Sequence, residues 1–128
     1  MNLLPFNRRG IYLIDTVGCL LLGAVLLTGA VPLAGAAGAG LAPDLLFWIG
    51  AALVPWAFFN LVIGLRPAFS PLAAAVNVAG DIAWVIASAA LLGTLTVTGA
   101  TVVAILAVGV AGIGLVKFTG LFAARRPA

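Results

Sequence analysis

Four long apolar stretches constrain the fold of this chain more than any other feature. They cover residues 11–29, 44–65, 72–93 and 100–122, and segments rich in Gly, Pro or Thr separate them. At about 1.5 Å per residue, each stretch is long enough as a helix to cross about 30 Å of hydrocarbon. The sequence therefore predicts an all-α, polytopic membrane protein, in which residues 1–128 form one bundle of four transmembrane helices.

The scarcity of charge supports this prediction. Of the 128 residues, 65% are hydrophobic and 7% are charged, whereas a soluble domain is about half apolar and a quarter charged. So few charges cannot cover a surface that faces water. The net charge of +3 resides on basic residues near the ends of the apolar stretches, which fits anionic lipid headgroups. We expect the lipid bilayer, and not nucleic acid, to be the partner of these residues.

Gly and Pro predict where the helices end. Residues 30–43, rich in Ala and Gly and containing Pro32 and Pro43, are predicted to form a loop. Pro43 and Asp44 favour a helix start, since proline suits the first helical position and a carboxylate suits the positive end of the helix dipole. Residues 66–71 are predicted to be a short turn, and residues 94–99 a tight turn rich in threonine.

Arginine placement predicts the topology. With four spans, one side of the membrane receives all five arginines, and the two loops on the opposite side contain no Lys or Arg. The positive-inside rule then predicts that both termini are cytoplasmic. We expect a multi-pass protein of the cell inner (plasma) membrane. The arginines are Arg8, Arg9, Arg66, Arg125 and Arg126.

Each apolar stretch carries a polar residue near its cytoplasmic end. Counted at about 1.5 Å per residue, four of these residues lie roughly 6–8 Å below the boundary, and Asp81 lies one turn deeper, at about 13 Å. Asn77, Asp81 and Ser88 share one stripe of their helix. In a four-helix bundle such residues would meet inside. The predicted intramembrane polar layer comprises Asp15, Asn60, Asn77, Asp81, Ser88 and Lys117.

Lys117 is the one cation within this layer. Its depth matches that of Asp15, so the pairing that costs least joins these two and leaves Asp81 with Asn77 or Asn60. Asp81 could instead carry a proton, since hydrocarbon disfavours an ionised carboxyl. Three roles stay open: the layer fixes the register of the helices, it forms a proton- or substrate-linked site around Asp81 and Lys117, or Lys117 and Asp15 simply reach the headgroups.

Small and aromatic residues predict helix contacts. A helix-packing ridge at i+4 spacing lies on the side of residues 72–93 away from Asp81, and it predicts that this helix is buried on two faces. Tyr12 and Trp48 fall near the expected interfaces and are typical of an aromatic belt. Trp56 and Trp84 fall mid-span and are expected to pack. The ridge consists of Ala75, Ala79, Ala83 and Ala87.

No pattern in the sequence indicates catalysis. The chain has no histidine and a single cysteine, Cys19, which argues against His-ligated haem, Cys/His zinc sites and intramolecular disulfides. Cys19 is expected to be a small buried apolar residue. There is no nucleophile with a histidine base and no Gly-rich phosphate loop before a helix. We therefore predict no catalytic, cofactor-binding or metal-binding residues, and no enzyme activity.

Two segments resemble a known group of proteins. Leu13-Ile-Asp15, the segment Asp81-Ile-Ala-Trp84-Val-Ile-Ala-Ser88 and the four-span plan are similar to those of a loose group of small bacterial integral membrane proteins without assigned function. The third span of that group carries an Asn-x-x-Trp-x-x-x-Ser pattern, to which Asp81, Trp84 and Ser88 correspond, with aspartate in place of asparagine. The resemblance implies a four-helix membrane fold and no particular activity.

Three classes of function are compatible with these features. The leading hypothesis is a non-catalytic accessory or structural subunit that packs in a larger membrane complex or in a homo-oligomer. The alternative is a small homo-oligomeric, proton-coupled transporter or channel that uses Asp81 and Lys117. A membrane-embedded enzyme acting on lipid or quinone is a third class. The expected partners are the bilayer and either other membrane subunits or further copies of the chain.

Overall fold

The computed structural model of this chain describes residues 8–38 and 41–123, and within these ranges it contains helices and no strands. The long helices are α1 (Arg8–Ala37), α2 (Pro43–Leu65), α3 (Pro71–Leu91) and α4 (Val97–Ala123), and a 3-10 turn, η1 (Leu92–Thr94), follows α3. Each of the four helices, with η1 counted as the end of α3, is long and apolar enough to cross a membrane. The predicted all-α fold with four such helices is confirmed.

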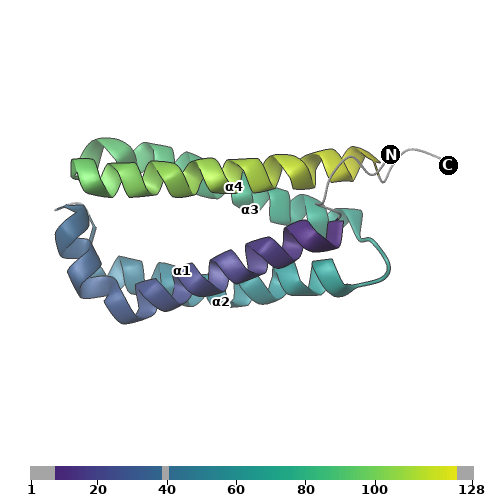
Figure 1. The fold of residues 1–128 in the computed structure, drawn as a ribbon, viewed down its shortest axis with the longest axis horizontal. Coiled ribbons are helices and arrows are strands. Elements are labelled where there is room, and N and C mark those ends of the chain that lie inside the picture. Colours follow the sequence, from purple (N-terminus) through teal and green to yellow (C-terminus); the bar gives the residue numbers. More distant parts are fainter. Residues whose placement is uncertain (1–7, 39–40, 124–128) are drawn as a thin grey trace.

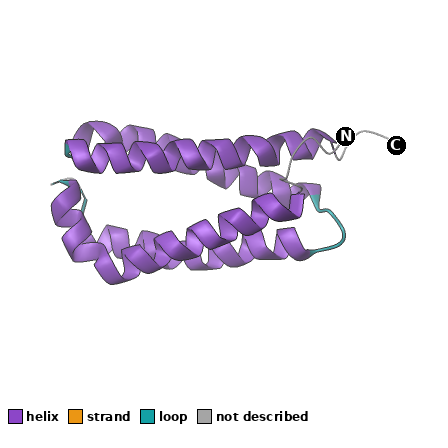
Figure 2. Ribbon diagram, viewed as in Figure 1, coloured by secondary structure: helices purple, strands orange, loops and turns teal. Residues whose placement is uncertain are grey.

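The helices form two antiparallel hairpins that lie as two layers. α1 packs mainly on α2, and α3 packs mainly on α4 (Figure 1). A short loop carries the chain from α2 in one layer to α3 in the other (Figure 2). The layers approach each other where α1 begins and α4 ends, diverge along the middle, and meet again at the far end, where the last turns of α1 bend toward the other layer (Figure 1). The first described residues, the α2–α3 loop and the end of α4 all lie at this one end of the molecule.

α1 is longer than predicted and is bent. Its backbone leaves helical geometry at Gly29 (φ −117°, ψ 17°), then resumes and runs through Pro32 to Ala37. The prediction of a loop at residues 30–37 is therefore wrong. Proline is tolerated in the first turn of a helix, which the break at Gly29 supplies, and alanine is the best helix former. The helix ends at Gly38, whose φ of 116° is the left-handed conformation that favours glycine.

The other helices match their predicted ranges within a few residues. Pro43 and Asp44 open α2 as expected. Ser70 Oγ caps α3 by accepting from the Ala73 amide at 3.3 Å, and Thr96 Oγ1 accepts from the Gly99 amide at 3.1 Å in the first turn of α4. Both are N-cap contacts. Since Thr96 caps α4 this early, the turn before it is shorter than the predicted range of 94–99.

Glycines allow α1 and α2 to approach closely. A Cβ added to Gly50 would lie 2.8 Å from Leu26 Cβ and 3.0 Å from the Gly23 carbonyl oxygen. Small residues at such a crossing let two backbones touch, as in membrane helix pairs. Beside this crossing lies the largest buried apolar cluster that the structure describes: Leu26, Ala30, Ala34, Leu41, Leu46 and Leu53.

Arginines gather at the end where the layers meet. Arg8 Nη2 donates to the carbonyl oxygens of Arg66 at 3.3 Å and Pro67 at 3.4 Å. The same guanidinium lies 5.1 Å from the centre of the Phe69 ring, a cation–π contact. Arg8 therefore joins the start of α1 to the α2–α3 loop. The prediction for Arg125 and Arg126 lies outside the described residues.

The predicted alanine ridge is not a contact within this chain. Its four members, Ala75, Ala79, Ala83 and Ala87, are all exposed on α3. The expectation that α3 is buried on two faces is therefore wrong for a single chain. Two hairpins stacked as layers leave every helix with an outer face, whereas the prediction assumed that α3 lay at the centre of the bundle.

Candidate functional site

A single buried ammonium joins all four helices. The side chain of Lys117, on α4, has no exposed surface. Its Nζ donates to Asp15 Oδ2 of α1, to Asn60 Oδ1 of α2 at 3.0 Å, and to Asn77 Oδ1 and Asp81 Oδ2 of α3 at 2.6 and 2.9 Å. An ammonium has three hydrogens, so four acceptors share three donors. We call these five residues the lysine cluster.

Tyr12 completes the surroundings of the ammonium. Lys117 Nζ lies 4.9 Å from the centre of the Tyr12 ring, and Tyr12 is only 2% exposed. The ring face stabilises a desolvated cation. Tyr12 is thus part of the site and not a membrane-interface anchor, so that prediction was wrong. Its position three residues before Asp15, on the same helix face, is the signal that could have indicated this.

The partners of Lys117 differ from those predicted. The expected contact with Asp15 is present, but Asp81 also pairs with Lys117 instead of with Asn60 or Asn77. Both amides turn their oxygens to the ammonium, because charge-assisted hydrogen bonds are stronger than those between neutral groups. The absence of exposed surface on the Lys117 side chain argues against the hypothesis that this residue reaches the headgroups.

The remaining predicted member of the polar layer lies elsewhere. Ser88 is buried, but it follows Asp81 by seven residues, about 10 Å along the helix axis. The structure therefore does not bring it to the lysine cluster. The shared stripe on α3 was correctly read, but the separation along the axis excludes Ser88 from contact with Lys117.

Gly114 lets α3 and α4 approach at the cluster. A Cβ added to Gly114 would lie 3.3 Å from Asp81 Cβ, which is tighter than ordinary contact. Gly114 precedes Lys117 by three residues, so both lie on the helix face that meets α3. The glycine thus makes room for Asp81 beside the ammonium.

The charges of the lysine cluster do not cancel. Asp15 and Asp81 supply two carboxyl groups, Lys117 supplies one ammonium, and the two amides are neutral. With both carboxyl groups ionised the net charge is −1, and uncompensated buried charge costs several kcal/mol. One further positive charge, from a proton or from another cation, makes the cluster neutral.

A cavity of about 620 Å³ lies between the two hairpins, next to this cluster. Proteins bind small molecules in cavities of this size, typically about 300–1,000 Å³. All four helices contribute to its walls, which are mostly aliphatic. The aromatic and polar lining residues are Asp15, Cys19, Trp56, Asp81 and Trp84.

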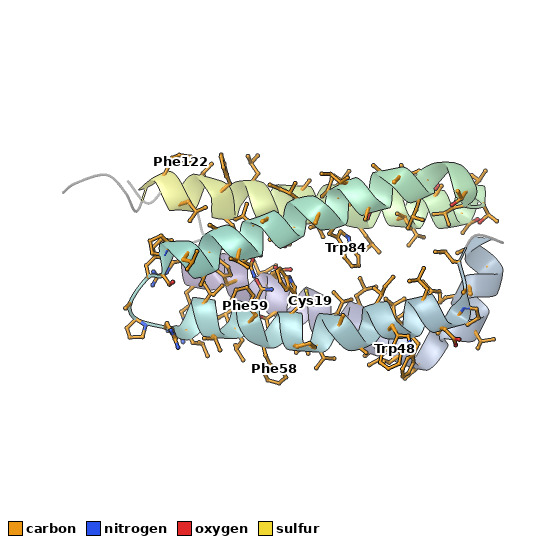
Figure 3. The ribbon with its side chains drawn as sticks, turned by 180° about the vertical axis from the view of Figure 1, so that it is seen from behind. Cys19, Trp48, Phe58, Phe59, Trp84 and Phe122 are labelled. Atoms are coloured by element: carbon orange, nitrogen blue, oxygen red, sulfur yellow. The ribbon has the colours of Figure 1, made fainter. Side chains whose placement is uncertain are left out.

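Trp84 lines the cavity and has a buried indole N–H without a hydrogen-bond partner. It points from α3 toward the α1–α2 hairpin, where Cys19 also lies (Figure 3). Among the described residues, Trp84 Nε1 and Asn77 Nδ2 are buried without a hydrogen-bond partner. A buried donor without a partner costs about 1–3 kcal/mol. The cavity therefore offers two indole rings on its walls and two carboxyl groups at one end.

Polar contacts between the hairpins lie beyond both ends of the cavity. At one end is the lysine cluster. At the other end the Thr96 amide donates to the Ala37 carbonyl oxygen at 2.9 Å, and Thr96 Oγ1 donates to the Ala36 carbonyl oxygen at 3.0 Å. Between these ends, the lining residues Gly18 and Ile105 are exposed. The cavity thus opens sideways at the surface that would face lipid.

Sequence reasoning missed the role of Cys19 and Trp56. Cys19 Sγ donates to Asp15 Oδ1 at 3.5 Å, and its spacing of four residues from Asp15 was the available signal. The Trp56 ring lies against Gly80, where an added Cβ would be 2.3 Å from Trp56 Cη2. Nothing in the sequence pairs Trp56 with Gly80, because that contact depends on how the two hairpins dock.

Comparisons with protein-family models, with curated proteins and with solved structures gave no match to this chain. Within the described residues, no group of three or more His, Cys, Asp or Glu side chains could hold a metal ion. The lysine cluster and the cavity beside it are therefore the features of this chain that bear on its function.

Proposed function

We propose that this chain is a multi-pass membrane protein that moves a small molecule in a proton-linked cycle, with the lysine cluster as its proton site. The observation that carries the proposal is the position of Asp15 and Asp81. Both contact Lys117, and both also line the cavity. A change in the charge of either carboxyl group is thereby felt by a bound molecule and by the contact that holds four helices together.

The charge count supports a proton site over a purely structural one. A cluster that only fixed helix register would need balanced charges, as in a one-to-one buried ion pair. Here the second carboxyl group leaves a net −1 beside a space large enough for a ligand. Ionisable residues in apolar membrane helices that face a cavity are typical of proton and substrate pathways.

The two end contacts support a carrier. The contacts of Lys117 with Asp15 and Asn60 join one hairpin to the other, as does the Thr96 contact, and the cavity lies between them. Alternating access requires one such contact to open while the other stays closed. The break at Gly29 separates the last two turns of α1, which hold the Thr96 contact, from the part that holds Asp15. The two contacts can therefore open independently.

Proton flux tests this proposal. The purified chain is reconstituted in liposomes that contain a pH-sensitive dye, and an inward pH gradient is applied. We expect a protein-dependent flux that Asp81→Asn abolishes, because the amide can no longer release a proton. Asp44→Asn is the matched control, since Asp44 is exposed at the start of α2. Equal flux with wild type, Asp81→Asn and empty liposomes would reject the proposal.

We place the arginine-bearing end in the cytoplasm of a bacterial cell, by the positive-inside rule. A reporter fused to the C-terminus tests this orientation. Green fluorescent protein is expected to fluoresce there, and alkaline phosphatase, which needs the periplasm, is expected to be inactive. The opposite pair of results would show that the orientation is inverted.

A second candidate is a non-catalytic accessory subunit in a larger complex or homo-oligomer. The observation that favours it is the outer face of α3, where the alanine ridge is exposed beside Val76, Ile82 and Ile86, which are 50%, 52% and 64% exposed. Small residues on a lipid-facing helix allow close approach of another helix. Retained self-association without any proton flux would favour this candidate over the carrier.

A further inference from the structure

We infer that the cavity between the hairpins binds an organic monocation with an apolar body, which displaces the proton of the lysine cluster. This inference rests on the proposed function and names the chemical class of its substrate. Three observations support it: the sign of the charge at the end of the cavity, the composition of its walls, and its sideways opening.

The charge at the end of the cavity is negative. Asp15 and Asp81 line the cavity, whereas Lys117 does not. Lys117 lies on the side of these carboxyl groups away from the cavity, and its Nζ donates to Oδ2 of each. Asp15 Oδ1 accepts from Cys19, and among the described residues the hydrogen bonds of Asp81 all involve Oδ2. Asp81 Oδ1 is therefore the acceptor that a ligand can reach.

The walls suit an apolar, positively charged body. Aliphatic side chains and glycines form most of the lining, and Trp56 and Trp84 add two indole rings. Indole faces attract cations, most strongly where water is excluded. No Lys or Arg lines the described cavity, so nothing there would bind an anion or repel a cation.

The sideways opening suits a ligand that dissolves in the bilayer. Ala52, Ile105 and Gly109, from α2 and α4, line the cavity and are exposed at the surface between the hairpins. If the helices cross a membrane, this surface faces lipid. A molecule with an apolar body and one delocalised positive charge can reach the cavity from there, whereas a strongly hydrated ion cannot.

One ligand and one proton compete for the same charge. The charged and titratable groups near Asp81 are Lys117 from α4 and Asp15, Tyr12 and Cys19 from α1, while the α2 residue Trp56 that lines the cavity with it carries no charge. A bound monocation brings the cluster to neutrality, so the shared proton leaves as the ligand enters. Binding must then weaken at low pH, about tenfold for each pH unit over which the site holds its proton.

Two probe ions of equal shape and opposite charge test the inference. Equilibrium dialysis of the purified full chain in detergent measures the binding of tetraphenylphosphonium and tetraphenylborate at pH 5, 6, 7 and 8. We expect saturable binding of the cation that strengthens as pH rises, and no saturable binding of the anion. Proton release on cation binding, followed in weak buffer, is expected to approach one per site.

Two pairs of variants locate the site. Asp81→Asn is expected to remove the pH dependence and to weaken cation binding at least tenfold, whereas Asp44→Asn leaves both unchanged. Trp84→Leu is expected to weaken binding by about two- to thirtyfold through loss of the cation–π contact. Its control is Trp48→Leu, since Trp48 is 67% exposed and outside the cavity.

Several results would overturn the inference. Equal binding of both ions would show a merely lipophilic space, and preference for the anion, or no binding of either ion, would reject the assigned charge. These comparisons use the wild-type chain and hold even where a variant fails to fold. Cation binding without proton flux would reject the proposed carrier and leave this inference standing, and flux without cation binding would do the reverse.

Discussion

Lys117 is the residue on which the packing of the two hairpins depends most. It contacts one acceptor on α1, one on α2 and two on α3. These contacts lie where few other polar groups join the hairpins. Removal of the ammonium would leave two carboxyl groups facing each other in an apolar interior, and loss of one partner from a buried ion pair costs about 3–5 kcal/mol.

Lys117→Met tests this dependence. We expect the free energy of unfolding to fall by about 3 kcal/mol or more, measured by titration with sodium dodecyl sulfate in mixed micelles. Adding Asp15→Asn and Asp81→Asn to this variant removes the stranded charges and is expected to restore part of the loss. A single Lys117→Met variant as stable as wild type would contradict the central role of the ammonium.

Individual residues also show how far the sequence could predict the site. The depths of Asp15, Asn60, Asn77 and Lys117 follow from counting residues along helices, and the structure brings these four together. The choice of partners could not be predicted in the same way. Because Lys117 and Asp15 lie at the same depth, the sequence predicted that Lys117 pairs with Asp15 alone. The position of Asp81 beside Lys117 depends instead on how closely Gly114 lets α3 and α4 approach.

At the scale of elements, α1 shows why helix ends were harder to predict than helices. Glycine and proline at positions 29 and 32 are breakers in an average context, yet here they bend α1 and let it continue to Ala37. Its last turns then contact Thr96. Whether α1 continues past the bend depends on a neighbouring segment that packs against its last turns. The sequence alone does not identify that segment. The packing of α2 against α3 is equally non-local.

The contact of Trp56 with Gly80 tests how α2 meets α3. A Cβ on Gly80 would overlap the Trp56 ring, so Gly80→Ala is expected to destabilise the fold by about 1–3 kcal/mol through overpacking. In a Trp56→Ala background the same substitution is expected to cost almost nothing. A double-mutant cycle measured by unfolding in mixed micelles gives this coupling. Additive effects of the two substitutions would show that the ring does not lie on Gly80.

At the scale of the whole molecule, a bundle of two layers leaves broad apolar faces. The sequence predicted four helices but placed α3 at the centre, because a polar stripe and an alanine ridge lie on opposite sides of it. In the structure the polar stripe is buried, with Asn77 and Asp81 in contact with Lys117 of α4, and the ridge faces outward. α3 therefore has two faces suited to helix contact, and only one of them packs within the chain. The other face indicates where a second helix can pack.

We expect a second copy of the chain to pack on this ridge, because small residues allow two apolar helices to approach within van der Waals distance in lipid. Ala79→Cys, introduced with Cys19→Ala so that one thiol remains, is expected to form a disulfide-linked dimer when membranes are oxidised. Leu115→Cys is the matched control, since Leu115 is 63% exposed on α4 and away from the ridge. Cross-linking at residue 115 and not at residue 79 would place the interface between copies on another face of the molecule. If the interface lies on another face, Ala79→Leu is expected to leave the dimer intact. If the interface lies on the ridge, the larger leucine side chain is expected to disrupt the dimer.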